Sequence, residues 1–247
     1  MKVDVHLVGL GPANDPNTIS QAVWIHLQRC EHIFYPGQWV NDDLIAAFGD
    51  RLTWGRHLRT EAILEAATQN ATASAPIAVL YNGDGRLFSG RGGAFASLGD
   101  METLLLSAGF VVKSWPGVNS VNAALDAAGW QLAAAPESAL LTVASLCRGP
   151  SGADALRRAA RCHAVLALLW CEDHADVAFD VLLQERGADV PIAIVKRLGS
   201  ADEETLQGPL DSLKPSFLAL RPPAVILVAQ RIFTDRNQFM GPCDPPS

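Results

Sequence analysis

The residues with the clearest chemical potential form a glycine-rich turn, NGDG, at residues 82–85. The turn follows the apolar run IAVLY at residues 77–81, and such a run bounded by turn residues predicts a strand buried on both faces of a parallel sheet. The two glycines permit a sharp bend and leave the main chain bare for a ligand. Asp84 would then accept hydrogen bonds at the carboxyl end of a strand, where α/β sheets bind small molecules. A plain surface turn with a solvated aspartate fits the same residues.

Two further glycine turns follow predicted strands. The first strand, residues 3–9, runs into GLGPANDP at residues 9–16, and the strand FVVKSW at residues 110–115 runs into PGVNS and the alanine-rich stretch VNAALDAAGW. The first of these turns lacks the third glycine of a GxGxxG phosphate cradle, and Asp15 would repel a pyrophosphate. Another class of ligand is therefore expected at this end of the sheet.

The order of these segments resembles the tetrapyrrole methylase family. VGLGPANDPNTIS at residues 8–20 is similar to the family's VGxGPGDPxxLT, GDGRLF to GDPxxY, and PGVNSVNAA to PGVSS or PGITA. YPGQWV at residues 35–40 is similar to the YAGSLV of the branch that methylates C11 of precorrin-4. VPIAIVKRLGSADEETLQGPLDSL and PPAVILVAQRI resemble later motifs, so the likeness covers residues 3–232.

This resemblance implies both fold and activity. It implies an α/β protein of two subdomains with mostly parallel sheets and a ligand cleft between them: residues 1–115, residues 116–240 and a tail at 241–247. The implied enzyme is an S-adenosylmethionine-dependent C-methyltransferase that acts on a precorrin-like tetrapyrrole in cobalamin biosynthesis and releases S-adenosylhomocysteine. A homodimer is usual in the family. Two alternatives are a relative that binds a ligand or partner without methylating, and an enzyme of this fold with another methyl acceptor.

The resemblance also assigns binding residues. Gly85 stands where the family has proline, Trp170 where it has methionine or a smaller residue, and Cys171 where glycine is common. In the loop that lines the substrate cleft of the family, Asp15 is a candidate general base. The residues implied in cofactor binding are Pro12, Asn82, Gly83, Asp84, Phe88, Asn119, Ser120, Trp170, Leu198 and Ala224.

Basic residues near the turns suit an anionic substrate. Residues 51–59 include Arg51, Arg56, His57 and Arg59. Arg86 directly follows the NGDG turn at residues 82–85, which we call the GD turn. A tetrapyrrole precursor carries acetate and propionate arms, and arginine binds carboxylates through two parallel hydrogen bonds. The substrate-binding candidates are therefore Arg56, Arg59 and Arg86, although a solvated basic loop accounts for the first two.

Composition excludes several classes of protein. The 247 residues are 49% hydrophobic and carry a net charge of −7, which indicates a globular protein and argues against general nucleic-acid binding. The sequence contains no apolar run long enough to span a membrane and begins with a strand pattern in place of a signal peptide. Five scattered cysteines favour reduced thiols and a cytoplasmic location.

A metal site is not expected. Cys171 with His174, and Cys162 with His163, supply too few ligands for the four-coordinate sites that zinc prefers. His6 and His163 fall in predicted buried strands and are expected to be core residues. The sequence also lacks G-x-S-x-G, Walker and H-E-x-x-H motifs.

Overall fold

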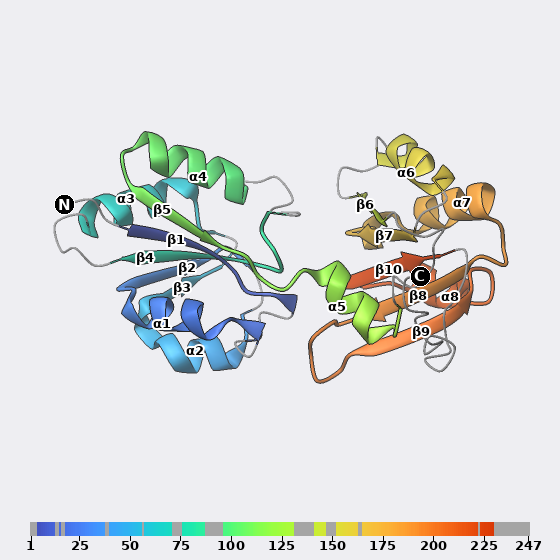
Figure 1. Ribbon diagram of the computed structural model, residues 1–247, viewed down its shortest axis with the longest axis horizontal. Coiled ribbons are helices and arrows are strands. Elements are labelled where there is room, and N and C mark those ends of the chain that lie inside the picture. The colour runs from blue at the N-terminus through green and yellow to red at the C-terminus, as the bar shows by residue number, and fades with distance from the viewer. Residues whose placement is uncertain are drawn as a thin grey trace, which may run out of the picture. The chain divides into compact units, whose positions relative to one another are not determined.

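The described residues form two five-stranded sheets, each with its own helices (Figure 1). A computed structural model describes residues 4–12, 15, 18–37, 40–55, 57–70, 76–86, 96–130, 141–146, 152–162, 165–221 and 223–229. The pattern of internal packing divides the chain into unit 1, Met1–Ser120, and unit 2, Val121–Ser247. This division lies just after PGVNS, the PG turn at residues 116–120, whereas the sequence predicts a boundary just before that turn. The predicted tail at 241–247 lies outside the described residues.

Unit 1 is a sheet of parallel strands in the order β3-β2-β4-β1-β5. All described neighbours pair in parallel, so the carboxyl ends of the strands meet at one end of the sheet. The strands are β1 (Asp4–Gly9), β2 (His32–Tyr35), β3 (Leu52–Trp54), β4 (Ile77–Tyr81) and β5 (Val111–Trp115), and the helices are α1 (Gln21–Arg29), α2 (Asp42–Phe48), α3 (Thr60–Asn70) and α4 (Leu98–Ser107).

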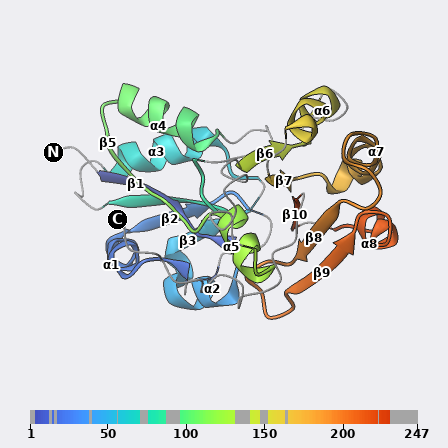
Figure 2. The same ribbon diagram turned by 45° about the vertical axis from the view of Figure 1, so that its right-hand side comes forward.

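Helices cover both faces of this sheet, as Figures 1 and 2 show. The central strand β4 explains why, because all of its residues are buried and its side chains alternate between two clusters. Ile77 and Val79 pack with residues of α3 and α4, such as Ile63 and Met101. Ala78 and Leu80 pack in the other cluster, which includes Leu27 of α1 and Leu44 of α2.

Side-chain caps set the starts of three helices in unit 1. The Ser20 hydroxyl accepts the Val23 amide, the Asn41 amide oxygen accepts the Asp43 amide, and Ser97 accepts the Asp100 amide. The sequence predicts a cap at Thr18 or Ser20 and another at Asn41, and the caps at Ser20 and Asn41 confirm this. The sequence also predicts a helix over residues 93–108, but that start is wrong, because Ala96 and Ser97 are not helical and Ser97 caps a helix that begins at Leu98.

Unit 2 contains a mixed sheet in the order β6-β7-β10-β8-β9. Strands β6 and β7 are parallel, and β10 is antiparallel to both of its neighbours, as β9 is to β8. The strands are β6 (Leu141–Ser145), β7 (Val165–Leu169), β8 (Pro191–Lys196), β9 (Glu204–Pro209) and β10 (Ala224–Val228), and the helices are α5 (Ser120–Ala127), α6 (Gly152–Arg161), α7 (Ala175–Arg186) and α8 (Lys214–Leu218).

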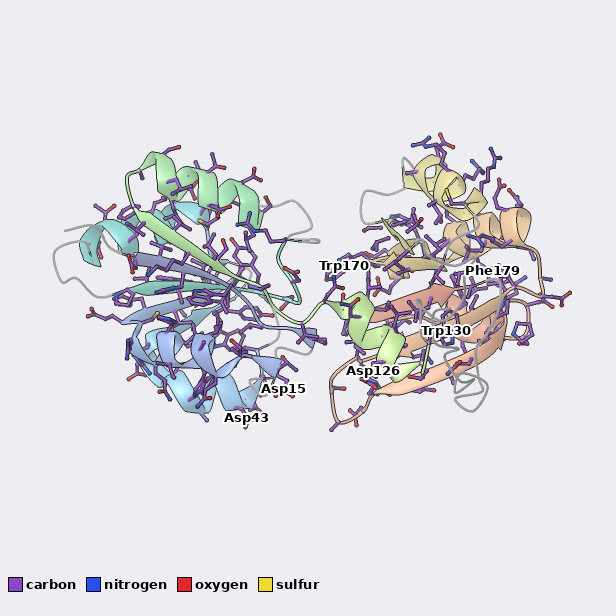
Figure 3. The ribbon with its side chains drawn as sticks, in the orientation of Figure 1. Asp15, Asp43, Asp126, Trp130, Trp170 and Phe179 are labelled. Atoms are coloured by element: carbon purple, nitrogen blue, oxygen red, sulfur yellow. The ribbon has the colours of Figure 1, made fainter. Side chains whose placement is uncertain are left out.

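Helices α6, α7 and α8 share one core with one face of this sheet (Figure 2). Phe179 of α7, labelled in Figure 3, and Phe217 of α8 meet edge to face in this core at 5.6 Å between ring centroids. Helix α5 is fastened to the other face. The indole of Trp130 donates to the Gln207 amide oxygen at 3.1 Å, and the Gln207 amide nitrogen donates to the Ala128 carbonyl at 3.0 Å. Gln207 lies opposite Ala193 in the β8–β9 register, away from Ile192 of the helix-covered face.

The predicted α/β fold of two subdomains is confirmed, but the expectation of mostly parallel sheets holds for unit 1 and not for unit 2, where β6 and β7 are the one parallel pair among the described strands. The basic residues at 51–59 favour a loop, but residues 52–54 form β3 at the edge of the unit 1 sheet. Helix α8 is not predicted from the sequence, because it has only five residues and contains a proline in its first turn. The sequence predicts strands at residues 203–208 and 223–228, where β9 and β10 lie, but it does not predict that they are antiparallel to their neighbours.

His6 is a buried core residue, as the sequence predicts. It is 2% exposed on β1, and its Nδ1 accepts a hydrogen bond from the Trp115 indole at 3.0 Å. Burial lowers the pKa of His6 to about 4, with further lowering by His26 and Lys113 and partial opposition from Asp4. The imidazole is therefore neutral, because a proton on Nδ1 would remove the acceptor that Trp115 needs.

We predict that this histidine makes the folded state acid-sensitive. The pKa of His6 is lower in the folded than in the unfolded chain, so the unfolded chain binds more protons between pH 6.5 and 4. Stability is then complete above about pH 6.5 and falls by about 2–3 kcal/mol as the pH drops to 4. Urea unfolding of His6→Gln, whose side chain still accepts from Trp115, should show a flatter profile. His57→Gln, at an exposed position, is the control, and equal pH profiles for wild type and His6→Gln would refute the prediction.

Candidate functional site

Three glycine turns cross at the carboxyl end of sheet 1. The Leu10 amide donates to the Tyr81 carbonyl at 2.8 Å, extending the β1–β4 pairing by one residue. Gly11 and Gly83 then exchange two main-chain hydrogen bonds, of 3.2 and 3.0 Å, in an isolated antiparallel bridge. The turn after β1 is thus bound to the turn after β4 by the backbone alone.

The turns lie so close together that Gly9 and Gly117 have no room for a side chain. A Cβ atom on Gly9 would lie 2.5 Å from the Gly117 nitrogen and 2.6 Å from the Gly83 oxygen. On Gly117 it would lie 2.7 Å from the Gly9 carbonyl carbon and 2.8 Å from the Gly11 nitrogen. Because the opposing atoms are main chain, no rotamer change relieves the overlap. We call Gly9, Gly11, Gly83 and Gly117 the glycine crossing.

Gly83 differs from the others because its missing side chain would meet nothing among the described residues. Its φ of 59° is left-handed, and no described heavy atom lies within 4 Å of the position of a Cβ. The amide and carbonyl of Gly83 are paired with Gly11, but the open space on its Cβ side lets a ligand approach the turn closely at the end of the sheet.

Thr18 holds the first turn in shape. Its hydroxyl oxygen lies 2.7 Å from the Leu10 carbonyl oxygen and 2.8 Å from that of Asp15, so its one proton is shared between them, and its amide donates to the Asp15 carbonyl at 3.0 Å. Asp15 is half-buried and lies in the loop between β1 and α1 (Figure 3). The buried Pro12 completes this turn through its carbonyl, which accepts the Asp15 amide at 3.3 Å.

Arg86 and residues of α4 and β5 hold the GD turn in place. The Asp84 carboxylate accepts the Arg86 amide at 3.0 Å, and the Arg86 guanidinium forms a forked ion pair with Glu102 of α4, with both N–O distances 2.7 Å. Arg86 also donates to the Ser114 hydroxyl of β5 at 2.8 Å. The hydrogen bond from Arg86 holds the pKa of Glu102 below its usual range. Arg86 therefore links the turn to α4 and β5.

Gly85 replaces the proline that is usual in the family, and its contacts give a reason. It is buried between two side chains, and a Cβ there would lie 2.6 Å from the Leu98 Cδ1 atom and 3.2 Å from the Tyr81 Cβ. With Leu98 seated so close, a residue that has a side chain would need Leu98 to shift.

Asn82 is exposed and is held from below by a buried tyrosine. The Tyr35 hydroxyl at the end of β2 donates to the Asn82 amide oxygen at 2.5 Å. On the β5 side, Asn119 and Ser120 are half-buried, and Ser120 is the first residue of α5. Pro12, Asn82, Gly83, Asp84 and Asn119 thus lie on turns that follow β1, β4 and β5 at one end of sheet 1.

Unit 2 gathers the remaining predicted cofactor residues at one end of its sheet. Trp170 follows β7, Leu198 follows β8 by two residues, and Ala224 begins the antiparallel β10 between them. The register Ala224–Lys196 and Val225–Leu169 makes these positions neighbours. The Trp170 side chain is half-buried, and Figure 3 shows it at the end of β7.

The backbone at this end of unit 2 is unusual. Among the described residues other than glycine, positive φ occurs at Trp170, 56°, and at Arg197, 52°, which lie after the parallel strands β7 and β8. Such conformations cost about 1–3 kcal/mol and tend to cluster at functional sites. Two hydrogen bonds hold the entry of β10 beside them: the Arg197 amide donates to the Pro223 carbonyl at 2.9 Å, and the Ala224 amide donates to the Glu172 carboxylate at 3.0 Å.

The cysteine after Trp170 is not a nucleophile. Cys171 is 1% exposed, and burial raises the pKa of its thiol to about 12. At neutral pH it stays a thiol, whereas thiolates are the form that attack substrates and bind metals. Within the described residues, no group of three or more histidine, cysteine or acidic side chains is arranged to hold a metal ion. No described helix has the length and apolar character needed to cross a membrane.

Some predicted residues fall elsewhere. Phe88 and Arg56 lie outside the described residues. Arg59 is exposed just before α3, in the connection that leaves the carboxyl end of β3. Sequence reasoning missed Tyr35, Thr18 and Glu172 as residues that hold the turns. YPGQWV is similar to a family motif, but nothing in it indicates which residue the tyrosine hydroxyl binds.

Comparison with known proteins gives one consistent result. The family model described as tetrapyrrole (corrin/porphyrin) methylases matches residues 4–214. The chain is 27% identical to the precorrin-4 C(11)-methyltransferase of Pseudomonas aeruginosa over 232 residues. The match covers 92% of this chain and 89% of that protein.

Solved structures agree on the fold. A cobalt precorrin-4 methyltransferase of cobalamin biosynthesis matches with a TM-score of 0.79 at 19% identity, over 92% of this chain and 94% of that one. The uroporphyrin-III C-methyltransferase of Thermus thermophilus, in complex with S-adenosylhomocysteine, matches with a TM-score of 0.71 at 25% identity, over 92% and 97%.

We predict that the glycine crossing tolerates no side chain at its centre. Gly117→Ala should destabilise unit 1 by about 1–3 kcal/mol, because the new methyl group overlaps fixed backbone. Gly99→Ala is the matched control: Gly99 lies in α4 with nothing within 4 Å of a Cβ, so alanine should stabilise the protein by about 0.5–1 kcal/mol. Urea unfolding measures both. An unchanged midpoint for Gly117→Ala would contradict the crossing as described.

Proposed function

Because this chain belongs to the tetrapyrrole (corrin/porphyrin) methylase family, we propose that it transfers the methyl group of S-adenosylmethionine to a carbon of a precorrin-like tetrapyrrole in cobalamin biosynthesis. The chain is thus an S-adenosylmethionine-dependent methyltransferase. The observation that carries the proposal is the bare, left-handed Gly83 on a turn that the glycine crossing fixes in place. The acceptor proposed is precorrin-4, in line with the relative from Pseudomonas aeruginosa.

The residues fit such a cofactor chemically. A zwitterionic sulfonium ligand needs hydrogen bonds from main-chain groups and small or apolar walls, and strong charges would be out of place. Asn82 supplies an amide, Gly83 leaves open space beside it, and Leu198 and Ala224 are apolar residues. Trp170 offers an indole face on which an adenine can stack. We propose that Pro12, Asn82, Gly83, Asp84, Phe88, Asn119, Ser120, Trp170, Leu198 and Ala224 bind S-adenosylmethionine.

The chemistry needs little from side chains. The bound cofactor supplies an activated methyl group and a neutral thioether leaving group. The chain contributes position and exclusion of water, since a rigid site converts a bimolecular encounter into an oriented one. Asp15, on the loop fixed by Thr18, is proposed to accept the proton that the ring loses after transfer.

The substrate's carboxylate arms are proposed to meet Arg56 and Arg59. Arg59 is exposed at the carboxyl end of sheet 1, the same end as the glycine crossing. Arg86 was a third candidate, but two of its nitrogens are already engaged by Glu102 and Ser114. We propose that Arg86 serves chiefly to brace the GD turn. A homodimer is also proposed on the strength of the family resemblance, and a cytoplasmic location on the five scattered cysteines.

Glycine variants at two ends of the same sheet test the cofactor site. Gly83→Ala and Gly109→Ala both place alanine at a left-handed residue, φ 59° and 87°, with nothing described within 4 Å of the new methyl group. Each should cost about 1–2 kcal/mol of stability. Gly109 precedes β5, at the opposite end of the sheet. Calorimetric titration with S-adenosylhomocysteine should therefore show weakened binding for Gly83→Ala and unchanged binding for Gly109→Ala.

The wild-type protein provides the direct test of the proposal. It should bind S-adenosylhomocysteine in a saturable titration, and with S-adenosylmethionine it should add one methyl group to precorrin-4, detected by mass spectrometry. Absence of heat at near-millimolar S-adenosylhomocysteine would overturn the proposal in favour of a relative that has lost methylation. Binding of the cofactor without methylation of precorrin-4 would leave the methyltransferase but replace its acceptor.

A further inference from the structure

The side chain of Tyr35 lies in the core, and its hydroxyl reaches the surface turn that follows the neighbouring strand β4. Tyr35 stands at the end of β2 and is 2% exposed, and its hydroxyl donates to the amide oxygen of the exposed Asn82 at 2.5 Å. A phenol has one proton to donate, and an amide has one oxygen to accept it. The hydrogen bond therefore decides which end of the Asn82 amide faces away from the sheet.

The tyrosine has little freedom to move. Its carbonyl accepts the Gly55 amide at 3.0 Å, which ties the end of β2 to the turn after β3. A Cβ on Gly37 would overlap the phenol ring, so the chain two residues on lies directly against Tyr35. In the core, the ring belongs to the cluster with Leu44 and Leu80. A rigid donor of this kind gives Asn82 one orientation at little cost in side-chain entropy.

We infer that Tyr35 is a positioning residue, which acts through Asn82 to present amide N–H donors to a carboxylate of the bound ligand. With its oxygen held by Tyr35, the amide of Asn82 has two N–H groups left for the exposed side. Asn82 immediately precedes Gly83, so these donors lie next to the bare main chain of the glycine crossing. A carboxylate accepts such bonds more strongly than a neutral group does.

This inference rests on the proposed function, which supplies two ligands with carboxylates. One is the amino-acid end of the cofactor, and the other is an acetate or propionate arm of the tetrapyrrole. The chemistry of recognition is the same for both. Titration with S-adenosylhomocysteine reports on the first, and the KM for precorrin-4 reports on the second.

The first experiment compares ligands with and without the carboxylate. Tyr35→Phe and Asn82→Ala should each weaken binding of S-adenosylhomocysteine, or raise the KM for precorrin-4, by about tenfold or more. Asn82→Asp should lose more, because it keeps an acceptor for Tyr35 but turns a second oxygen toward the ligand's charge. Affinity for 5′-methylthioadenosine, which has no carboxylate, should stay within about twofold of wild type, since a single lost contact far from this ligand changes little.

The second experiment is a double-mutant cycle. If Tyr35 acts through Asn82, then Tyr35→Phe should have no further effect on ligand binding in the Asn82→Ala background. Tyr81→Phe is the matched control, since it removes another buried hydroxyl from the residue next to Asn82 on β4. It should leave the ratio of affinities for S-adenosylhomocysteine and 5′-methylthioadenosine unchanged. Thermal unfolding of each variant separates a loss of fold from a loss of the contact.

The outcomes separate this inference from the proposed function. If wild type binds S-adenosylhomocysteine but Asn82→Ala binds it and uses precorrin-4 as wild type does, the inference fails and the proposed function stands. An effect of Tyr35→Phe that persists in the Asn82→Ala background, or one that weakens 5′-methylthioadenosine equally, also overturns it. If wild type binds no cofactor, both fall.

Discussion

The exclusion of side chains from the glycine crossing is the constraint on which the rest of unit 1 depends. Parallel strands bring their carboxyl ends to one end of a sheet, but ordinary turns there would keep about a side chain's width between them. At Gly9, Gly11 and Gly117 there is no such width, because a Cβ would lie less than 3.0 Å from main-chain or Thr18 atoms. The turns can then hydrogen-bond to one another, which leaves Gly83 free to face outward. A surface made of backbone is both rigid and open.

Unit 2 reaches a similar result with different means. Its sheet is mixed, so an antiparallel strand, β10, starts where β7 and β8 end. Main-chain and carboxylate acceptors at Pro223 and Glu172 hold that start, and the two exits take left-handed conformations at Trp170 and Arg197 without glycine. In both units, therefore, the turns expected to meet a ligand are held largely by hydrogen bonds of main-chain groups, supplemented by side chains such as Glu172 and Tyr35.

This division explains which features the sequence reveals. Buried apolar runs such as residues 77–81, and caps such as Ser20 and Asn41, are local patterns with a local physical cause, so the order of elements and the GD and PG turns were predictable. The direction of strands in unit 2 was not predictable, because a buried apolar run such as β10 carries no signal of its direction. The Tyr35–Asn82 bond joins residues 47 apart, and the Glu172–Ala224 bond residues 52 apart. No spacing rule links them, and only the folded chain brings them together.

The departures from the family pattern follow the same logic. Gly85 in place of proline accompanies a close Leu98, and Trp170 stands at a left-handed exit whose backbone is held by its neighbours. The hydrogen bonds described for the crossing and for the β10 entry involve neither Gly85 nor Trp170. A catalyst that relies on an activated methyl donor needs orientation more than it needs acid or base groups. It can therefore keep its backbone frame while side chains such as Asn82 and Trp170 change, and differences in acceptor among relatives are then to be sought in those side chains and in what holds them from behind.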